Sequence, residues 1–297
     1  MFDVVLLDRG FWIIQTLNTL QLAMLLFLLS VGLSVILGLM NFVNLAHGSF
    51  YALGAFIGYS IARHLDSFWL ALVFAPVAVA LIGAVLYATL ISRMRRAGPM
   101  RQVLVTFGLI FVLMDGMRLL WGSDPLGLTG DLPFSGSVQV LGQTYPAYRL
   151  FIIAVGLLVF AALYALLEHT RLGAEVRAGV DDAEMASCLG IDVERTFFNV
   201  FLLGCGLAGL AGIVALPAFS AEPGMGVAIL VQTLVVVVVG GLGSLRGAML
   251  GSLLVAATLT FGRVLVPEFA SIIMYALLLL VLLLRPQGLF SARSGVA

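Results

Sequence analysis

Long, continuous apolar stretches dominate this sequence and limit the chain to folds that a lipid bilayer can surround. Of the 297 residues, 62% are hydrophobic and only 10% are charged, whereas about 25% of the residues in a soluble domain are charged. A membrane-spanning helix needs about 20 apolar residues in a row, and a membrane β-barrel would instead show alternating polarity. The sequence therefore predicts an all-α, polytopic transmembrane helical bundle.

Eight or nine such stretches predict one transmembrane domain over residues 1–297. The expected spans cover residues 13–39, 43–62, 68–92, 101–122, 149–168, 196–216, 225–241, 248–265 and 268–284. The segment 41–54 is rich in Asn, Gly and Ser. An alternative interpretation of the first two spans is therefore one long helix followed by a broken or re-entrant element.

The arginines predict which side of the membrane each connection faces, because positive charge gathers in cytoplasmic loops. Ten arginines lie in alternate connections and the tail, and three lie in the intervening ones: Arg93, Arg95, Arg96, Arg101, Arg171, Arg177, Arg195, Arg246, Arg285 and Arg293, against Arg9, Arg63 and Arg149. We therefore expect the C-terminus and the loop 169–195 in the cytoplasm. The N-terminus and the loop 123–147, with a short hairpin near residues 137–141, are expected outside.

Composition also excludes several functions. A phosphate-binding P-loop requires a lysine after its glycines, and the sequence has no lysine, so any ATP must bind to partner subunits and the chain itself needs no cofactor. A net charge of zero gives no reason to expect nucleic acid as a partner; membrane lipid is the expected surrounding. The histidines and the two cysteines, Cys188 and Cys205, form no metal-ligand pattern and no expected disulfide. No catalytic residue set is recognisable, so no enzyme activity is expected.

A cluster of polar residues predicts a break in a membrane helix near residue 47. Polar side chains at a break can bond the freed backbone groups, and transporters also place broken helices at their solute sites. Both interpretations stay open. The candidate path residues in this segment are Asn41, Asn44, His47, Gly48 and Ser49.

A second group of candidate path residues follows the span at 225–241. Small residues let membrane helices approach closely, which is the interpretation we give to the glycines of the span at 196–216. The stretch 240–247 holds more glycine than packing requires, so it predicts unwound backbone or a tight turn that lines the path. Its candidate residues are Gly240, Gly241, Gly243 and Ser244.

The predicted cytoplasmic loop 169–195 is long and charged, and residues 182–189 fit a short amphipathic helix that Gly190 ends. Met185, Ala186 and Leu189 can share one face of this helix, with Asp182 and Glu184 turned toward solvent. Such a helix docks on a partner or lies on the membrane surface. We expect docking on an ATP-binding partner, because acidic residues near the helix start disfavour anionic lipid. The candidate coupling residues are Asp182, Glu184, Met185, Ala186, Leu189 and Gly190.

These motifs together resemble the LivH-type permeases of bacterial ABC importers for branched-chain amino acids. Residues 44–55 resemble the family's Asn-Phe-Ala-His-Gly signature, with Leu45 in place of Phe. Residues 184–190 resemble the Glu-Ala-Ala-x-x-x-Gly coupling motif, with Met185 in place of the first Ala. Residues 240–251 and 285–290 are similar to the family as well, so the resemblance covers nearly the whole chain.

The resemblance implies a multi-subunit importer in the bacterial inner (plasma) membrane. Its other members would be a second, LivM-type permease, two ATP-binding subunits and a periplasmic solute-binding protein. The expected solute is a branched-chain or related amino acid, although relatives are also associated with urea, amides and organic acids. ATP on the partner subunits would power alternating access, which the helix at 182–189 would transmit.

The alternative is a stand-alone secondary transporter of a small organic solute. Such a carrier would normally need an intramembrane carboxylate or ion site for coupling, and the sequence shows no convincing one. An enzyme acting on lipid would need catalytic groups clustered at one interface, which are lacking. The glycine-rich, broken spans disfavour a purely structural scaffold.

Overall fold

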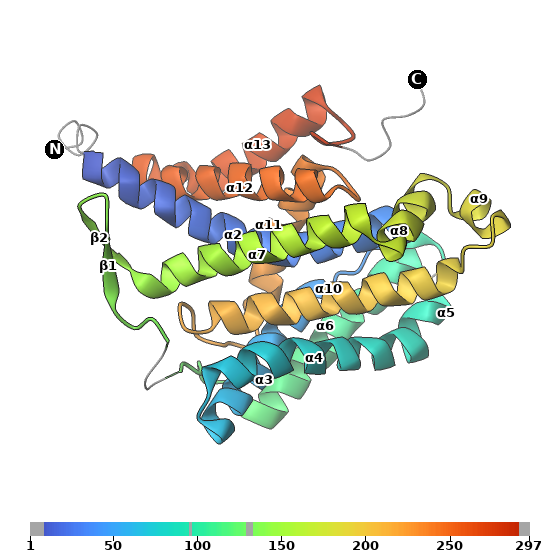
Figure 1. Ribbon diagram of the computed structural model, residues 1–297, viewed down its shortest axis with the longest axis horizontal. Helices are drawn as coiled ribbons and strands as arrows, with labels where there is room; N and C mark the ends of the chain where they lie inside the picture. The colour runs from blue at the N-terminus through green and yellow to red at the C-terminus, as the bar shows by residue number, and fades with distance from the viewer. Residues whose placement is uncertain (1–8, 95–96, 129–132, 291–297) are drawn as a thin grey trace.

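The computed structural model describes residues 9–94, 97–128 and 133–290 and is a bundle of helices with one small hairpin (Figure 1). Most of the long helices run along the long axis of the molecule, whereas α11 crosses them. The elements are α2 (Arg9–Met40), α3 (His47–Leu65), α4 (Phe68–Leu86), η1 (Tyr87–Ile91), α5 (Ser92–Met94), α6 (Pro99–Trp121), β1 (Ser137–Val140), β2 (Gln143–Pro146), α7 (Ala147–His169), α8 (Arg171–Asp181), α9 (Ala183–Cys188), α10 (Val193–Ala215), α11 (Met225–Gly240), α12 (Leu245–Leu265), η2 (Pro267–Phe269) and α13 (Ala270–Leu284).

Every stretch expected to span the membrane is helical, with ends within about four residues of the expected ones. Six helices of the described part of the chain are long and apolar enough to cross a membrane: Arg9–Met40, Phe68–Met94, Pro99–Trp121, Ala147–His169, Val193–Ala215 and Leu245–Leu265. Met225–Gly240 and Ile272–Leu284 are shorter apolar helices. The chain is therefore a multi-pass membrane protein, and its total of nine spans stays a prediction.

Helix α2 forms the centre of the bundle. It packs on α7, α10, α11 and α12, and residues 23–36 are buried on every side. A helix that is apolar all round is one that the rest of the protein encloses. The first predicted span is thus the core of the fold rather than a lipid-facing helix.

Helix α10 reaches α2 and α3 through glycines. A Cβ added to Gly32 of α2 would lie 2.9 Å from the Cα of Gly204. One added to Gly54 of α3 would lie 2.5 Å from the Cα of Gly209. Since no Cβ separates them, the backbones touch directly, as small residues allow in membranes. The packing interpretation of the glycines in this span is confirmed.

A wider, π-helical turn follows helix α4. Its α-helical part stops at Leu86, and η1 forms a π-helical turn before α5. Buried residues recur at every fourth position through this region, at Val79, Gly83, Tyr87 and Ile91. The rings of Tyr87 and Phe201 of α10 lie 5.4 Å apart, so the wide turn keeps this stripe against α10.

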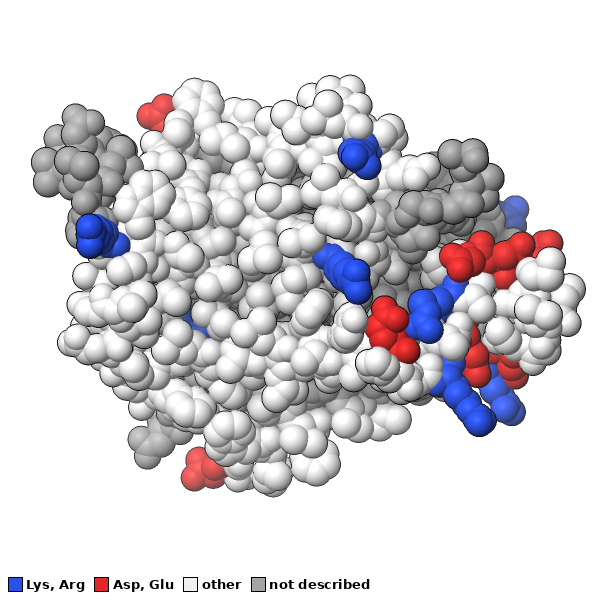
Figure 2. Space-filling model, turned by 45° about the horizontal axis from the view of Figure 1, so that its top comes forward, with Lys and Arg blue, Asp and Glu red and all other residues white. Residues whose placement is uncertain are grey.

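The two ends of the molecule differ in charge. The hairpin lies at one end in Figure 1, and α8 and α9 lie at the other. Its strands pair antiparallel, with Ser137 opposite Pro146, which confirms the hairpin expected near residues 137–141. Figure 2 shows charged side chains gathered at the α8 and α9 end and a broad middle band with few charges. This band has the polarity of a surface that lipid covers.

Candidate solute path and coupling surface

The chain reverses direction after α2, deep inside the bundle. Asn41 has a left-handed backbone (φ 47°), which asparagine tolerates better than most residues. The Oδ1 of Asn44 then accepts a hydrogen bond from the Ala46 N–H at 3.1 Å. The Nε2 of His47 lies 3.0 Å from the carbonyl oxygen of Leu29. Because Leu29 lies eleven residues before the end of α2, α3 begins about 16 Å back along α2. The predicted break within residues 41–54 is therefore confined to residues 41–46.

Two polar side chains of α6 hold this break, and we call them the α6 clamp: Gln102 and Thr106. The Oε1 of Gln102 accepts a hydrogen bond from the Val43 N–H at 3.4 Å, and its Nε2 donates to the carbonyl oxygen of Ala97 at 3.0 Å. The Oγ1 of Thr106 accepts from the Leu45 N–H at 3.3 Å. Both side chains are buried. This clamp is not predictable from the sequence, because about sixty residues separate the partners.

The break also holds two buried polar atoms that make no hydrogen bond within the described part of the chain. They are the Nδ2 of Asn44 and the Nδ1 of His47. Asn44 is 1% exposed and His47 is 0% exposed. Buried polar atoms are nearly always bonded, so each exception calls for an explanation. Both atoms belong to one turn, where they can bond a polar group that enters the bundle.

The start of α11 meets the start of α3 at this turn. A Cβ added to Gly48 would overlap the carbonyl oxygen of Gly226 and lie 3.1 Å from the Cβ of Leu230. Helix α11 crosses the direction of the long helices (Figure 1). Two helix N-termini, which carry partial positive charge, therefore meet beside the turn that holds Asn44 and His47.

Residues 240–244 form a tight turn that packs on α2. Gly241 and Gly243 have φ angles of 100° and 75°, which glycine adopts at no steric cost. The Gly243 N–H donates to the carbonyl oxygen of Ser34 at 3.1 Å. The Oγ of Ser244 accepts from the Gly247 N–H at 3.0 Å and caps α12. The predicted tight turn is confirmed, and its place in a solute path stays a prediction.

The structure thus places the nine candidate path residues in two neighbouring groups along α2. Asn44, His47, Gly48 and Ser49 surround the buried break. Gly240, Gly241, Gly243 and Ser244 form the turn toward the charged end, and Gly243 and Ser244 line a cavity of about 310 Å³. Asn41 and Leu242 line a second cavity of about 260 Å³. Asn41 therefore connects the break with the turn.

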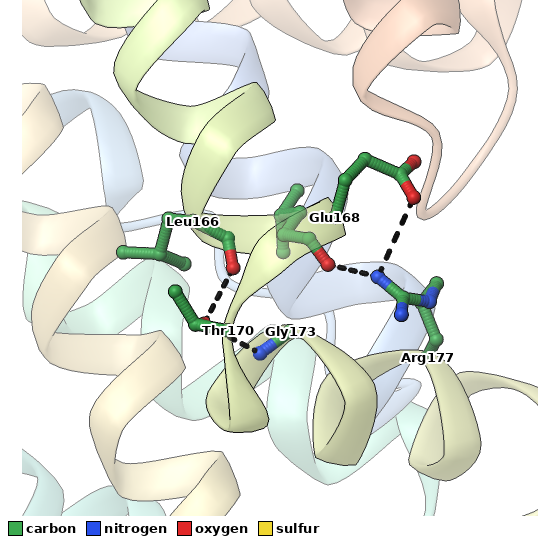
Figure 3. A network of polar contacts seen from close by, with 6 residues as sticks. Leu166, Glu168, Thr170, Gly173 and Arg177 are labelled. Carbon is green, nitrogen blue, oxygen red and sulfur yellow. Dashed lines mark hydrogen bonds and ion pairs between the residues drawn. The ribbon is translucent and has the colours of Figure 1, made fainter.

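The predicted coupling loop is more ordered than expected. It holds two helices, α8 and α9, where the sequence predicts one. Figure 3 shows how α8 folds back on the end of α7. The Oγ1 of Thr170 accepts from the Gly173 N–H at 3.2 Å. The Arg177 guanidinium donates to the carbonyl oxygen of Leu167 and lies 3.8 Å from the carboxylate of Glu168. These bonds attach α8 firmly to α7.

Helix α9 presents an apolar edge to the surroundings. Asp182 caps it by accepting from the Met185 N–H at 2.9 Å. It ends at Cys188 and is followed by the cap residue Leu189 and by Gly190 (φ 87°), whose N–H donates to the carbonyl oxygen of Ser187 at 3.0 Å, so the predicted glycine stop is confirmed. Met185 and Leu189 are 57% and 76% exposed. Large apolar side chains with this exposure at a charged end are typical of an interaction site.

The other candidate coupling residues differ in how far they are buried. Asp182, Glu184 and Gly190 are exposed, as expected. Ala186 is only 2% exposed, so it cannot share the outward face that the sequence predicts for it with Met185 and Leu189. Contacts between helices explain the burial of Ala186, because α9 packs on α8 and α10.

A lipid-compatible helical bundle with polar groups buried at a helix break is an arrangement that membrane transport proteins use. Residues 15–282 match the family described as "Branched-chain amino acid transport system / permease component". The chain therefore belongs to this permease family. As a permease component it is a transport subunit and not itself an ATPase.

Known relatives agree over most of their length. The chain is 28% identical to the high-affinity branched-chain amino acid transport system permease protein LivH of Salmonella typhimurium, over 88% of this chain and 90% of the relative. It is 28% identical to BraD of Pseudomonas aeruginosa, over 93% and 94%. It is 26% identical to LivM of Escherichia coli, over 92% of this chain and 69% of the relative. None of the solved structures matches the chain.

Proposed function

We propose that this permease carries a branched-chain amino acid inward as part of an ATP-driven complex. The family and the names of its relatives support this solute. Escherichia coli has both a LivH and a LivM permease that resemble this chain. That pairing supports a second permease as partner, with two ATP-binding subunits and a solute-binding protein to complete the complex. The arginine distribution supports a cytoplasmic C-terminus, and the relatives support a place in a bacterial inner membrane with eight or nine spans.

The buried break between α2 and α3 carries the proposal for the solute path. The free Nδ2 of Asn44 lies beside two helix N-termini and can donate to the carboxylate of an amino acid, which suits that end of the solute. The free Nδ1 of His47 is an acceptor, because Nε2 donates to the carbonyl oxygen of Leu29, so it suits the ammonium group of the solute. The solute would then pass along α2 to the turn at residues 240–244, whose cavities open toward the charged end.

Isolation of the complex from its native membrane tests this function. Mass spectrometry of the gently purified complex is expected to find a second permease, two ATP-binding subunits and a solute-binding protein with a bound branched-chain amino acid. Recovery of the chain alone would favour the stand-alone secondary transporter. A different bound solute would keep the complex and change the proposed substrate.

Exchange of His47 separates contact with the solute from support of the fold. In His47→Gln the amide nitrogen can replace Nε2 in the contact with Leu29, and only the free Nδ1 is lost. We expect the solute concentration for half-maximal uptake to rise at least about tenfold, because a bond to the charged ammonium group of the solute is lost. Uptake at varied concentrations in proteoliposomes of the full complex measures this.

The reciprocal variant His47→Asn serves as the control. Its amide oxygen can replace Nδ1 as an acceptor, but the shorter side chain does not reach Leu29, so we expect lower thermal stability with a smaller change in half-maximal concentration. An unchanged concentration dependence in His47→Gln would show that Nδ1 does not contact the solute.

We propose that α9 docks on an ATP-binding subunit, because Met185 and Leu189 project from the charged end while Asp182 and Glu184 keep it polar. The native Cys188 is exposed on this helix, whereas Cys205 is buried. A thiol-reactive crosslinker added to the intact complex is therefore expected to join the chain to an ATP-binding subunit. The product should vanish in Cys188→Ala and persist in Cys205→Ala. Crosslinks to lipid or detergent alone would place α9 on the membrane surface.

A further inference from the structure

The cavity between the start of α12 and the segment after α13 is open, positively charged and built from fixed backbone. It measures about 470 Å³ and is lined by Ser244, Arg246 and residues 285–290. Two of the lining residues are arginines, Arg246 and Arg285, and among the described residues that line the cavity none carries a carboxylate. Such a lining attracts an anion, and the first turn of α12 adds the partial positive charge of a helix N-terminus.

Backbone hydrogen bonds hold the wall of this cavity. The Leu289 N–H donates to the carbonyl oxygen of Val239 at 2.9 Å, and the Phe290 N–H donates to that of Gly240 at 3.0 Å. The Gly288 N–H donates to the carbonyl oxygen of Arg285 at 2.9 Å. The backbone of Arg285 is therefore held in place, and its side chain is exposed. A fixed backbone lowers the ordering cost for an anion that binds here.

The second arginine borders two cavities. Arg246 lies in the first turn of α12, and its guanidinium carbon is 6.0 Å from the centre of the Tyr164 ring. Arg246 and Ser244 line both this cavity and the neighbouring one, which contains Glu168, Arg177 and Asp181. The acidic residues of this region therefore lie on the α7–α8 side, and the Arg246 guanidinium lies between them and the side toward Arg285.

An exposed apolar face of α13 begins next to Arg285. Helix α13 ends at Leu284, next to Arg285, and packs mainly on α12 and α11. Its side chains at Ile272, Tyr275, Leu279 and Leu283 are 60%, 50%, 60% and 75% exposed. Their spacing of three and four residues places them on one face. This face runs along the lipid-compatible length of the molecule and ends at the charged cavity.

We propose that this cavity binds the phosphate group of an anionic phospholipid whose acyl chains lie on the exposed face of α13. The two arginines supply the charge complementarity, and basic pockets at the ends of membrane helices hold anionic headgroups in this way. The adjacent apolar face favours a lipid over a soluble phosphate, which has no acyl chain to bury there. The proposal does not depend on which solute the permease carries.

Lipid retention by the complete transporter tests the site. The complex is reconstituted in nanodiscs with equal amounts of phosphatidylglycerol and phosphatidylethanolamine, and native mass spectrometry counts the lipids that remain bound. Each arginine near an anionic headgroup contributes roughly fivefold in affinity. The double variant Arg246→Gln/Arg285→Gln is therefore expected to retain phosphatidylglycerol roughly twentyfold less well, with no change for phosphatidylethanolamine.

A matched control removes the same charge from the same end of the molecule. Arg171 and Arg195 are exposed and lie outside the cavity, so Arg171→Gln/Arg195→Gln should retain phosphatidylglycerol like the unmodified complex. Equal retention by both double variants would overturn the proposal, as would an unmodified complex that retains no phosphatidylglycerol because a partner subunit covers α13. If the first double variant fails to assemble, the unmodified complex still tests the proposal. Phosphatidylglycerol should raise its melting temperature, and phosphatidylethanolamine should not.

Discussion

Replacing Gly48 by valine is expected to prevent the permease from assembling into a stable complex. The added Cβ would overlap the carbonyl oxygen of Gly226, and a backbone atom cannot swing aside as a side chain can. Overpacking of a filled site costs about 1–3 kcal/mol and sometimes more, and we expect the upper end here. Size-exclusion chromatography and thermal unfolding of the full complex measure the loss.

Gly116 of α6 provides the matched control. A Cβ added there meets no atom within 4 Å, so Gly116→Val introduces the same side chain into a membrane helix with open space around it. The yield and melting temperature of this variant should equal those of the unmodified complex. If Gly48→Val behaves like the control, α3 and α11 do not approach each other as described.

Removal of the Thr106 hydroxyl is expected to impair transport strongly. Thr106→Val keeps the shape of the side chain, but the Leu45 N–H loses its acceptor. A backbone donor that is left without a partner costs about 1–3 kcal/mol, so the break between α2 and α3 should lose its fixed conformation. We expect the maximal uptake rate to fall at least about fivefold, as measured in proteoliposomes of the full complex.

Two further variants isolate the role of the clamp. Thr106→Ser restores the hydroxyl and should restore most of the uptake rate. Thr258→Val removes a hydroxyl that bonds only the carbonyl oxygen of Leu254 on its own exposed helix face, and it should transport normally. Equal loss in Thr106→Val and Thr106→Ser would mean that packing, and not the hydrogen bond, matters at this position.

The positions of the helices follow from local features of the sequence. Continuous apolar runs determine where helices form, and glycines such as Gly190 and Gly241 determine where they end. The break after Met40 was predictable because Asn and Gly interrupt an apolar run there. These signals act between residues that are near one another in the chain, so a single sequence displays them.

Contacts between distant segments were not predictable in this way. Gln102 and Thr106 look like ordinary polar residues near the start of a span until the fold brings residues 43–45 against them. The outward face expected for Ala186 is wrong because α8 and α10 cover it. Helix α8 was overlooked because its charges suggested a loop, although Leu172, Val176 and Val180 recur with helical spacing.

The π-helical turn in η1 gives this stretch of the chain a tolerance in length. Such a turn closes with i→i+5 hydrogen bonds and takes up one residue more than an α-helical turn. Deleting one residue from Tyr87–Ile91 would therefore leave a regular α-helix whose later residues keep their direction. The carbonyl oxygen of Met94, now 3.5 Å from the Nε2 of Gln102, would stay beside the clamp. A homologous permease with one residue fewer in this helix could therefore hold the break in the same way.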